Sequence, residues 1–208
     1  MDQSQLELGW DPEVDTPATI TVLGGGMLAV EAALYARFLG YSVLLIDRGK
    51  IGDRLLAWGD LPLTNGEGSG ATWGEVTTPL GLAALQAQHG EQALPPLNEP
   101  VTYRQYVERY LLPVARTDLL HDFVQVHSVV RSISRLGCTP TGRQQLTSCS
   151  LEQRSELLFR VMIDARSRGE YSQLCDVVLD CSEVGAERTG LAFGGGLAVG
   201  ESRFTEEM

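Results

Sequence analysis

The chain has 208 residues, of which 43% are hydrophobic and 21% charged, as in a globular protein with one substantial core, and this composition argues against disorder. Its formal net charge of −11 disfavours nucleic acid and anionic membrane surfaces as partners, because both would repel it. No apolar run reaches the roughly 18 to 20 residues of a membrane span. The first residues are acidic and contain no Lys or Arg, unlike a secretory signal. We therefore expect a cytoplasmic protein in which residues 1–18 form an acidic leader.

The elements that follow this leader form a strand, a glycine turn, a helix and a second strand. Residues 19–23 are a β-branched run, typical of a buried parallel strand. Apolar and alanine residues at helical spacing predict a helix over 27–39, and Gly40 ends it. A second strand is predicted over 42–46, closed by Asp47. The sequence therefore predicts a βαβ unit at the start of the domain.

The interval 49–100 contains many Gly and Pro residues and is predicted to be a loop-rich insertion with one short helix, over 80–88. Thr102 is a suitable N-cap for a further helix over 103–115, because apolar residues recur on one face of that segment. We expect the insertion to be either functional or partly disordered.

The remainder of the chain is predicted to consist mainly of strands. They cover 123–126, 128–136, 144–152, 156–164 and 176–180. The three middle strands predict an antiparallel meander over 128–164, and the last is a buried return strand. We expect the domain to extend over 19–184, with residues 185–208 as a glycine-rich tail.

The residues between the first strand and the first helix follow the pattern G-x-G-x-x-G/A, with Gly24, Gly26 and Ala29 in the defining positions. In this pattern the first glycine permits a tight turn, the second lets a pyrophosphate approach the backbone, and the small third residue lets the helix pack closely. The N-terminus of the helix offers free N–H groups to phosphates. Asp47 ends the second strand at the spacing expected of a carboxylate that binds ribose hydroxyls. The pattern predicts dinucleotide binding; the alternative is a tight turn in a nucleotide-free α/β protein.

The order of the later elements distinguishes between cofactors. A nicotinamide dehydrogenase domain would continue with alternating helices and parallel strands, whereas this chain continues with a long loop, a helix, a strand, a meander and a return strand. That order resembles the FAD domain of the two-dinucleotide-binding flavoproteins, which include thioredoxin reductase, glutathione reductase and flavin-containing monooxygenases. Residues 24–47 are similar to their flavin fingerprint, and residues 176–182 to the strand that returns beside the flavin.

The resemblance implies an α/β, Rossmann-like FAD/NAD(P)-binding fold: a parallel sheet of three or four strands, helices on both of its faces, and a three-stranded antiparallel meander. It assigns Gly24 and Gly26 to the pyrophosphate and Asp47 to the adenosine ribose. It places the backbone of Val129 against the adenine and the turn at Ser182 near the pyrophosphate or flavin.

Four further residues complete the predicted cofactor-binding set: Gly25, Ala29, Arg48 and Trp58. Trp58 is a candidate for stacking on the flavin, and Trp73 is a weaker one. We assign no chemical role to Gly25 beyond flexibility of the turn. FAD is the expected cofactor, with NAD(P) as the alternative.

The chain differs from this family in several respects. Asp47 stands where the family usually has Glu, and Glu183 follows Ser182 where the family usually has Gly. We expect the Glu183 carboxylate to repel the phosphates of FAD and weaken its binding. The chain has no room for a second, NAD(P)H-binding domain, and its four cysteines contain no C-x-x-C redox pair.

Three functions are consistent with these features. The first is an FAD-dependent oxidoreductase, either truncated or reliant on a partner for the NAD(P)H side, in which the flavin carries the redox chemistry. The second is a non-catalytic dinucleotide-binding module, or a degenerate one, that acts as a sensor or interaction domain. The third is an NAD(P)-dependent dehydrogenase. We identify no catalytic nucleophile, general base or metal site, and we expect a protein partner or self-association if interdomain surface is exposed.

Overall fold

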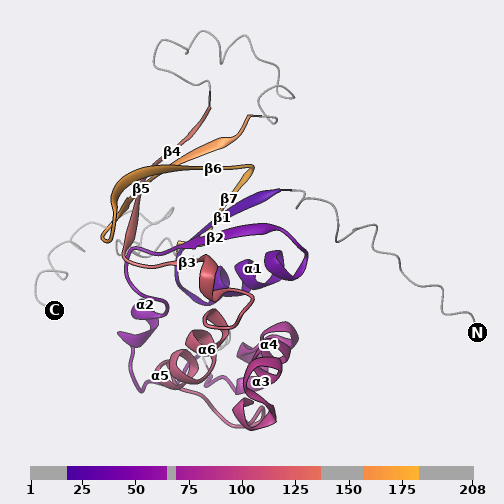
Figure 1. The fold of residues 1–208 in the computed structure, drawn as a ribbon. Helices are drawn as coiled ribbons and strands as arrows, with labels where there is room; N and C mark the ends of the chain where they lie inside the picture. Colours follow the sequence, from indigo (N-terminus) through magenta and orange to yellow (C-terminus); the bar gives the residue numbers. More distant parts are fainter. Residues whose placement is uncertain (1–17, 65–68, 137–156, 183–208) are drawn as a thin grey trace, which may run out of the picture.

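The computed structural model describes residues 18–64, 69–136 and 157–182, and the statements below concern these residues. A parallel sheet of four strands, in the order β3-β2-β1-β7, forms the centre of the fold (Figure 1). The strands are β1 (Thr19–Leu23), β2 (Ser42–Ile46), β3 (Val124–Gln125) and β7 (Val177–Asp180). The predicted leader (save Ala18), the predicted strand at 144–152 and the predicted tail at 185–208 lie outside the described residues.

The strand β1 lies between β2 and β7 and is covered on both faces of the sheet, so the side chains of residues 20–23 are all buried. Val22 in β1 and Leu45 in β2 are completely buried. At the other end of β1, the backbone N–H and hydroxyl of Thr19 both donate hydrogen bonds to Asp176 Oδ2, at 2.8 and 2.7 Å. These bonds fix the chain at the start of β7 beside the first strand.

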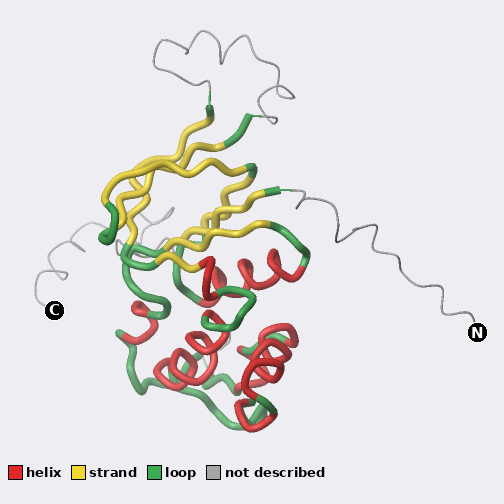
Figure 2. Tube along the Cα trace, viewed as in Figure 1, coloured by secondary structure: helices red, strands yellow, loops and turns green. Residues whose placement is uncertain are grey.

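One face of the parallel sheet is covered by helices (Figure 2). The first, α1 (Met27–Phe38), connects β1 to β2 and packs through small residues such as Ala29 and Ala33, which are completely buried. The others are α2 (Asp53–Leu56), α3 (Trp73–Val76), α4 (Pro79–His89), α5 (Tyr103–Tyr106) and α6 (Leu112–Ala115), with the short 3₁₀ turns η1 (Glu91–Ala93) and η3 (His121–Phe123). No helix in the described ranges is long and apolar enough to cross a bilayer.

The predicted helices are confirmed, and the structure adds a π-helical segment within one of them and two single-turn helices. The helix predicted over 103–115 is continuous, but its middle, η2 (Val107–Leu111), is a π-helical segment between α5 and α6. The loop-rich interval contains α4, close to its predicted bounds, and also the single-turn helices α2 and α3, which are too short to produce a periodic pattern.

The opposite face of the parallel sheet is covered by an antiparallel sheet of β4 (Ser128–Arg135), β5 (Phe159–Ala165) and β6 (Gly169–Cys175) (Figure 1). Leu23 and Ile46 of the parallel sheet form a second core cluster with apolar residues of β5, including Val161 and Ile163. The α/β fold with its three-stranded antiparallel meander is thus confirmed.

Two details of the prediction are corrected. The described helices cover one face of the parallel sheet only, because the strands that lead from β3 to β7 occupy the other. The meander extends to Cys175 rather than ending at Asp164, because β6, which the sequence pattern does not predict, pairs with β5. That strand has mostly exposed and partly buried residues and contains no β-branched side chain, so its composition gives little strand signal.

Candidate functional site

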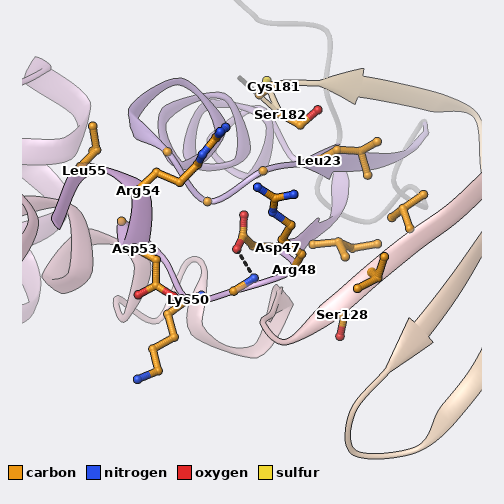
Figure 3. Close-up of a pocket in the computed structure, with 18 of the residues that line it drawn as sticks. Leu23, Asp47, Arg48, Lys50, Asp53, Arg54, Leu55, Ser128, Cys181 and Ser182 are labelled. Atoms are coloured by element: carbon orange, nitrogen blue, oxygen red, sulfur yellow. Dashed lines mark hydrogen bonds between the residues drawn. The ribbon is translucent and has the colours of Figure 1, made fainter. Parts of the chain in front are cut away.

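A cavity of about 820 Å³ lies at the carboxyl ends of β1, β2 and β7 (Figure 3). Open α/β sheets bind ligands at this edge. Its walls come from the glycine turn, the segment after β2, the helix α2, the strand β4 and the residues after β7; they comprise residues 23–26, 46–50, 52–55, 57, 128–133, 181 and 182. The cavity therefore gathers parts of the chain that are far apart in the sequence.

Gly24 makes the turn out of β1, and the protein itself requires a glycine there. Its backbone φ of +113° is a value that residues with a side chain rarely adopt. A Cβ at this position would lie 2.7 Å from the carbonyl oxygen of Cys181. The N–H of Gly24 donates to Ile46 O at 2.8 Å, and the N–H of Cys181 donates to Leu23 O at 2.9 Å. The turn is thereby held between β2 and β7.

Gly25, for which only flexibility of the turn is predicted, allows the Asp47 carboxylate to approach the turn. A Cβ on Gly25 would lie 2.9 Å from the carboxyl carbon of Asp47. The carbonyl of Gly25 accepts a hydrogen bond from the N–H of Gly52, at 2.8 Å, which connects the turn to the start of α2. The missing signal was the distant Asp47, which a local pattern does not include.

Gly26 differs from the other two glycines, because its conformation does not require glycine. Its φ of −85° and ψ of −173° are extended values that any residue adopts. It is the N-cap of α1, where no side chain supplies a capping hydrogen bond, so the first N–H groups of the helix lack the partner that a cap provides. Gly26 also lines the cavity. A group that approaches this backbone closely would explain the glycine, and a pyrophosphate fits that description.

Asp47 lies at the end of β2, with its side chain held against the turn. Its Oδ1 accepts a hydrogen bond from the N–H of Gly49 at 2.6 Å (Figure 3). Burial raises the pKa of this carboxyl, and the effect is opposed by the N–H of Gly49 and the charge of Arg48. The backbone is fixed on both sides, since Asp47 N–H donates to Gln125 O and Ser128 N–H donates to Asp47 O, each at 2.9 Å. A carboxylate placed in this way has lone pairs left for ribose hydroxyls.

Positive charge outnumbers negative charge among the described side chains that line the cavity. Four are basic and two acidic: Arg48, Lys50, Arg54 and Arg131 against Asp47 and Asp53. In a protein with a net charge of −11, a basic lining favours an anionic ligand such as a phosphate.

The basic residues differ in their surroundings. Arg131 is bound to Asp164 of β5, with 2.6 Å between Nη2 and Oδ2. In Figure 3, Arg54 points from α2 toward the side of the cavity where Cys181 and Ser182 lie, whereas the Lys50 side chain points away. Of these cations the sequence predicted only Arg48, since isolated charges in a loop form no motif.

Most residues of the predicted cofactor-binding set line the cavity. They are Gly24, Gly25, Gly26, Asp47, Arg48, Val129 and Ser182. Ala29 is completely buried, where its small size lets α1 pack on the sheet. Ser182 donates its hydroxyl to Asp180 Oδ1. Glu183 lies outside the described residues.

The two tryptophans considered as flavin contacts, Trp58 and Trp73, lie outside the cavity lining. Trp58 does not line the cavity; it is 59% exposed and stacks on Tyr103, with 6.0 Å between ring centroids. Trp73 is buried in the helical core against Tyr106. In the part of the chain that the structure describes, no three His, Cys, Asp or Glu side chains form a metal-binding group.

No family model and no curated protein sequence matches the chain. Among solved structures, it is similar to OTEMO in complex with FAD and NADP, at 14% identity and a TM-score of 0.49, over 81% of this chain and 26% of that one. An oxidized steroid monooxygenase bound to NADP shares 17% identity at a TM-score of 0.48, over 79% and 26% of the two chains. Bacillithiol disulfide reductase Bdr from Bacillus cereus shares 15% identity at 0.47, over 78% and 39%. The chain thus spans less than half the length of each of these proteins.

Proposed function

We propose that this chain is an FAD-binding domain of oxidoreductase type, with FAD held in the cavity at the carboxyl ends of β1, β2 and β7. The observation that carries the proposal is Gly26: its backbone conformation is open to any residue, yet a glycine borders the cavity at the start of α1. Close approach of a pyrophosphate to the backbone would account for it. The basic lining supports the same ligand class.

Different residues of the cavity would bind different parts of FAD. The turn at Gly24–Gly26 and the N-terminus of α1 would bind the pyrophosphate, and Asp47 would accept hydrogen bonds from the adenosine ribose. Val129 on β4 would border the adenine, and Ser182 would lie on the pyrophosphate or flavin side. When bound, the flavin supplies the redox chemistry, while the protein orients it and limits its contact with water.

The position of Asp47 supports FAD or NAD over NADP. A 2′-phosphate on the adenosine would have to approach the Asp47 carboxylate, and like charges at short range repel. FAD and NAD have free ribose hydroxyls, which can donate to this carboxylate. The architecture then favours FAD over NAD, since an antiparallel layer, rather than further alternating helices and parallel strands, follows the first βαβ unit.

The test is a titration calorimetry series in which the full chain is given FAD, NAD and NADP separately, together with the absorbance spectrum of the purified protein. We expect FAD to bind most tightly and NADP most weakly. Gly26→Val should abolish the heat of FAD binding while the far-UV circular dichroism is unchanged. Equal affinity for all three dinucleotides, or no binding of FAD to the wild-type protein, would contradict the proposal.

A second function, a dinucleotide-binding module without catalysis, is favoured by one observation. The described lining contains a single thiol, Cys181, and burial, together with the nearby Asp180, raises its pKa, so that it stays protonated near neutral pH. A protonated thiol is a poor nucleophile. Anaerobic NADH or NADPH should bleach the flavin absorbance of an oxidoreductase, alone or with a partner, and leave that of a binding module unchanged. Partner dependence, self-association and a cytoplasmic location stay predictions.

A further inference from the structure

The start of α2 is held beside the glycine turn by the backbone. The N–H of Gly52 donates to the carbonyl of Gly25 at 2.8 Å, and Asp53 Oδ2 accepts the N–H of Lys50 at 2.8 Å. Gly52 itself adopts a φ of +78°, and a Cβ there would lie 2.5 Å from Val107 Cγ1, so this turn packs closely on the helical layer. Whatever side chain follows Asp53 is therefore presented next to the turn.

That side chain is Arg54, which is partly buried and lines the cavity. In Figure 3 its guanidinium extends toward the side where Cys181 and Ser182 border the cavity. We infer that Arg54 binds the pyrophosphate of the dinucleotide, so that a guanidinium from α2 and the N-terminus of α1 hold it together. This inference rests on the proposed function, since it concerns the same cavity.

The other basic residues of the lining are less suited to this role. Arg131 lies on β4 and is held on the antiparallel layer by Asp164 of β5, at 2.6 and 3.2 Å from two of its nitrogens. Arg48 lies beside Asp47, whose carboxylate its charge favours, and the Lys50 side chain points away from the cavity (Figure 3). Arg54 has an interaction of its own in the described structure, so a phosphate would replace or share that partner.

The chemistry of arginine suits the assignment. A guanidinium presents a planar fork of N–H donors that matches two phosphate oxygens, and charge-assisted hydrogen bonds of this kind are about twice as strong as neutral ones. Helix N–H groups alone provide partial charges. A full charge from α2 would therefore contribute a large share of the affinity for any ligand with a pyrophosphate, and none for a ligand without phosphate.

The experiment compares three probes on four proteins. FAD, ADP and adenosine are titrated into wild-type protein and into Arg54→Gln, Arg54→Lys and Arg116→Gln, by calorimetry for FAD and ADP and by NMR for adenosine. Arg116 is exposed and outside the cavity lining, so it is the charge-matched control. Thermal unfolding of each variant checks that it is folded.

We expect Arg54→Gln to weaken FAD and ADP by about 10- to 100-fold, the range for a lost hydrogen bond to a charged group. Adenosine should be unaffected, Arg54→Lys should recover part of the loss, and Arg116→Gln should behave as wild type. Raising the salt concentration should narrow the difference between wild type and Arg54→Gln for ADP.

Three results would overturn the assignment in distinguishable ways. If wild type binds FAD and ADP but Arg54→Gln binds them equally well, the proposed function stands and the role of Arg54 is wrong. If Arg54→Gln weakens adenosine as much as ADP, Arg54 acts on the shape of the cavity and not on phosphate. If wild type binds none of the three probes, the proposed function is wrong, and the assignment of Arg54 is wrong with it.

Discussion

Replacing Gly24 and Gly26 separately should distinguish a glycine that the fold requires from one that the ligand requires. Gly24 has a φ of +113°, and a Cβ there would lie 2.7 Å from the Cys181 carbonyl oxygen. Backbone strain of this kind costs on the order of 1 to 3 kcal/mol, and displacement of Cys181 adds to it. We therefore expect Gly24→Ala to lower the melting temperature by roughly 3 to 10 °C or more, at about 2 to 4 °C per kcal/mol for a chain of this size.

Gly26→Val should have the opposite profile. The φ of −85° and ψ of −173° are allowed for valine. A poorer N-cap lowers the free energy of unfolding by about 1 kcal/mol. The reduced entropy of the unfolded chain raises it by about 0.4 to 1 kcal/mol. The melting temperature should therefore shift by only a few degrees, while FAD binding is lost because the branched side chain occupies the space of the pyrophosphate.

Gly169→Ala is the matched control for Gly24→Ala. Gly169 also has a positive φ, +75°, but a Cβ there would have no neighbour within 4 Å. The difference in unfolding free energy between the two alanine variants, measured by urea denaturation, gives the cost of the contact with Cys181. If Gly26→Val destabilises as much as Gly24→Ala, or binds FAD with wild-type affinity, the division of roles between these glycines is wrong.

Three further substitutions test the roles predicted for individual carboxylates, two in the described structure and one, Glu183, outside the described residues. Burial raises the pKa of Asp47, so the favourable contribution of this carboxyl to stability is present below its ordinary pKa and is lost as the pH rises through the raised value. Asp47→Asn should therefore stabilise the free protein at neutral pH, as measured in thermal scans. The same substitution should weaken FAD binding by about tenfold or more. The hydrogen bonds from Thr19 lower the pKa of Asp176, so the stabilising contribution of this carboxylate is present at neutral pH and is lost as the pH falls through the lowered value. Asp176→Asn should therefore destabilise the protein at pH 7 and have a smaller effect on stability in acid. Equal effects at the two pH values would contradict this prediction. Glu183→Gly should tighten FAD binding, with a gap between the two proteins that narrows at high salt, and an unchanged affinity would show that Glu183 does not face the phosphates.

The βαβ unit could be predicted from the sequence because its signals are local. The helix over 27–39 ends one residue later than α1, and the strand over 42–46 coincides with β2. A glycine pattern, an alanine-rich periodicity and apolar runs all fall within a short segment, and each has its own physical cause. The same applies to α4, which has a proline at its start and Gly90 at its end.

The rest of the site depends on contacts between distant segments, which a local pattern does not contain. The need for glycine at position 25 comes from the Asp47 carboxylate, and part of the need at position 24 comes from Cys181. Arg54 was missed because α2 is a single turn within a loop-rich interval. Trp58 is a candidate for flavin contact by residue type alone, whereas in the structure it stacks on Tyr103, a residue distant in the sequence.

The position of β1 at the centre of the parallel sheet has a consequence for folding. Its pairing with β2 closes a short loop, but its pairing with β7 brings together Thr19 and Asp176, which are 157 positions apart. Long-range pairing of this kind carries a larger loop-closure entropy and slows folding. We therefore expect the βαβ unit to form early and the wall of the cavity at Cys181 and Ser182 to be completed late. A dinucleotide that needs both the glycine turn and this wall would bind only after β7 has paired with β1. By mass action, its binding would shift the equilibrium from late intermediates toward the native state.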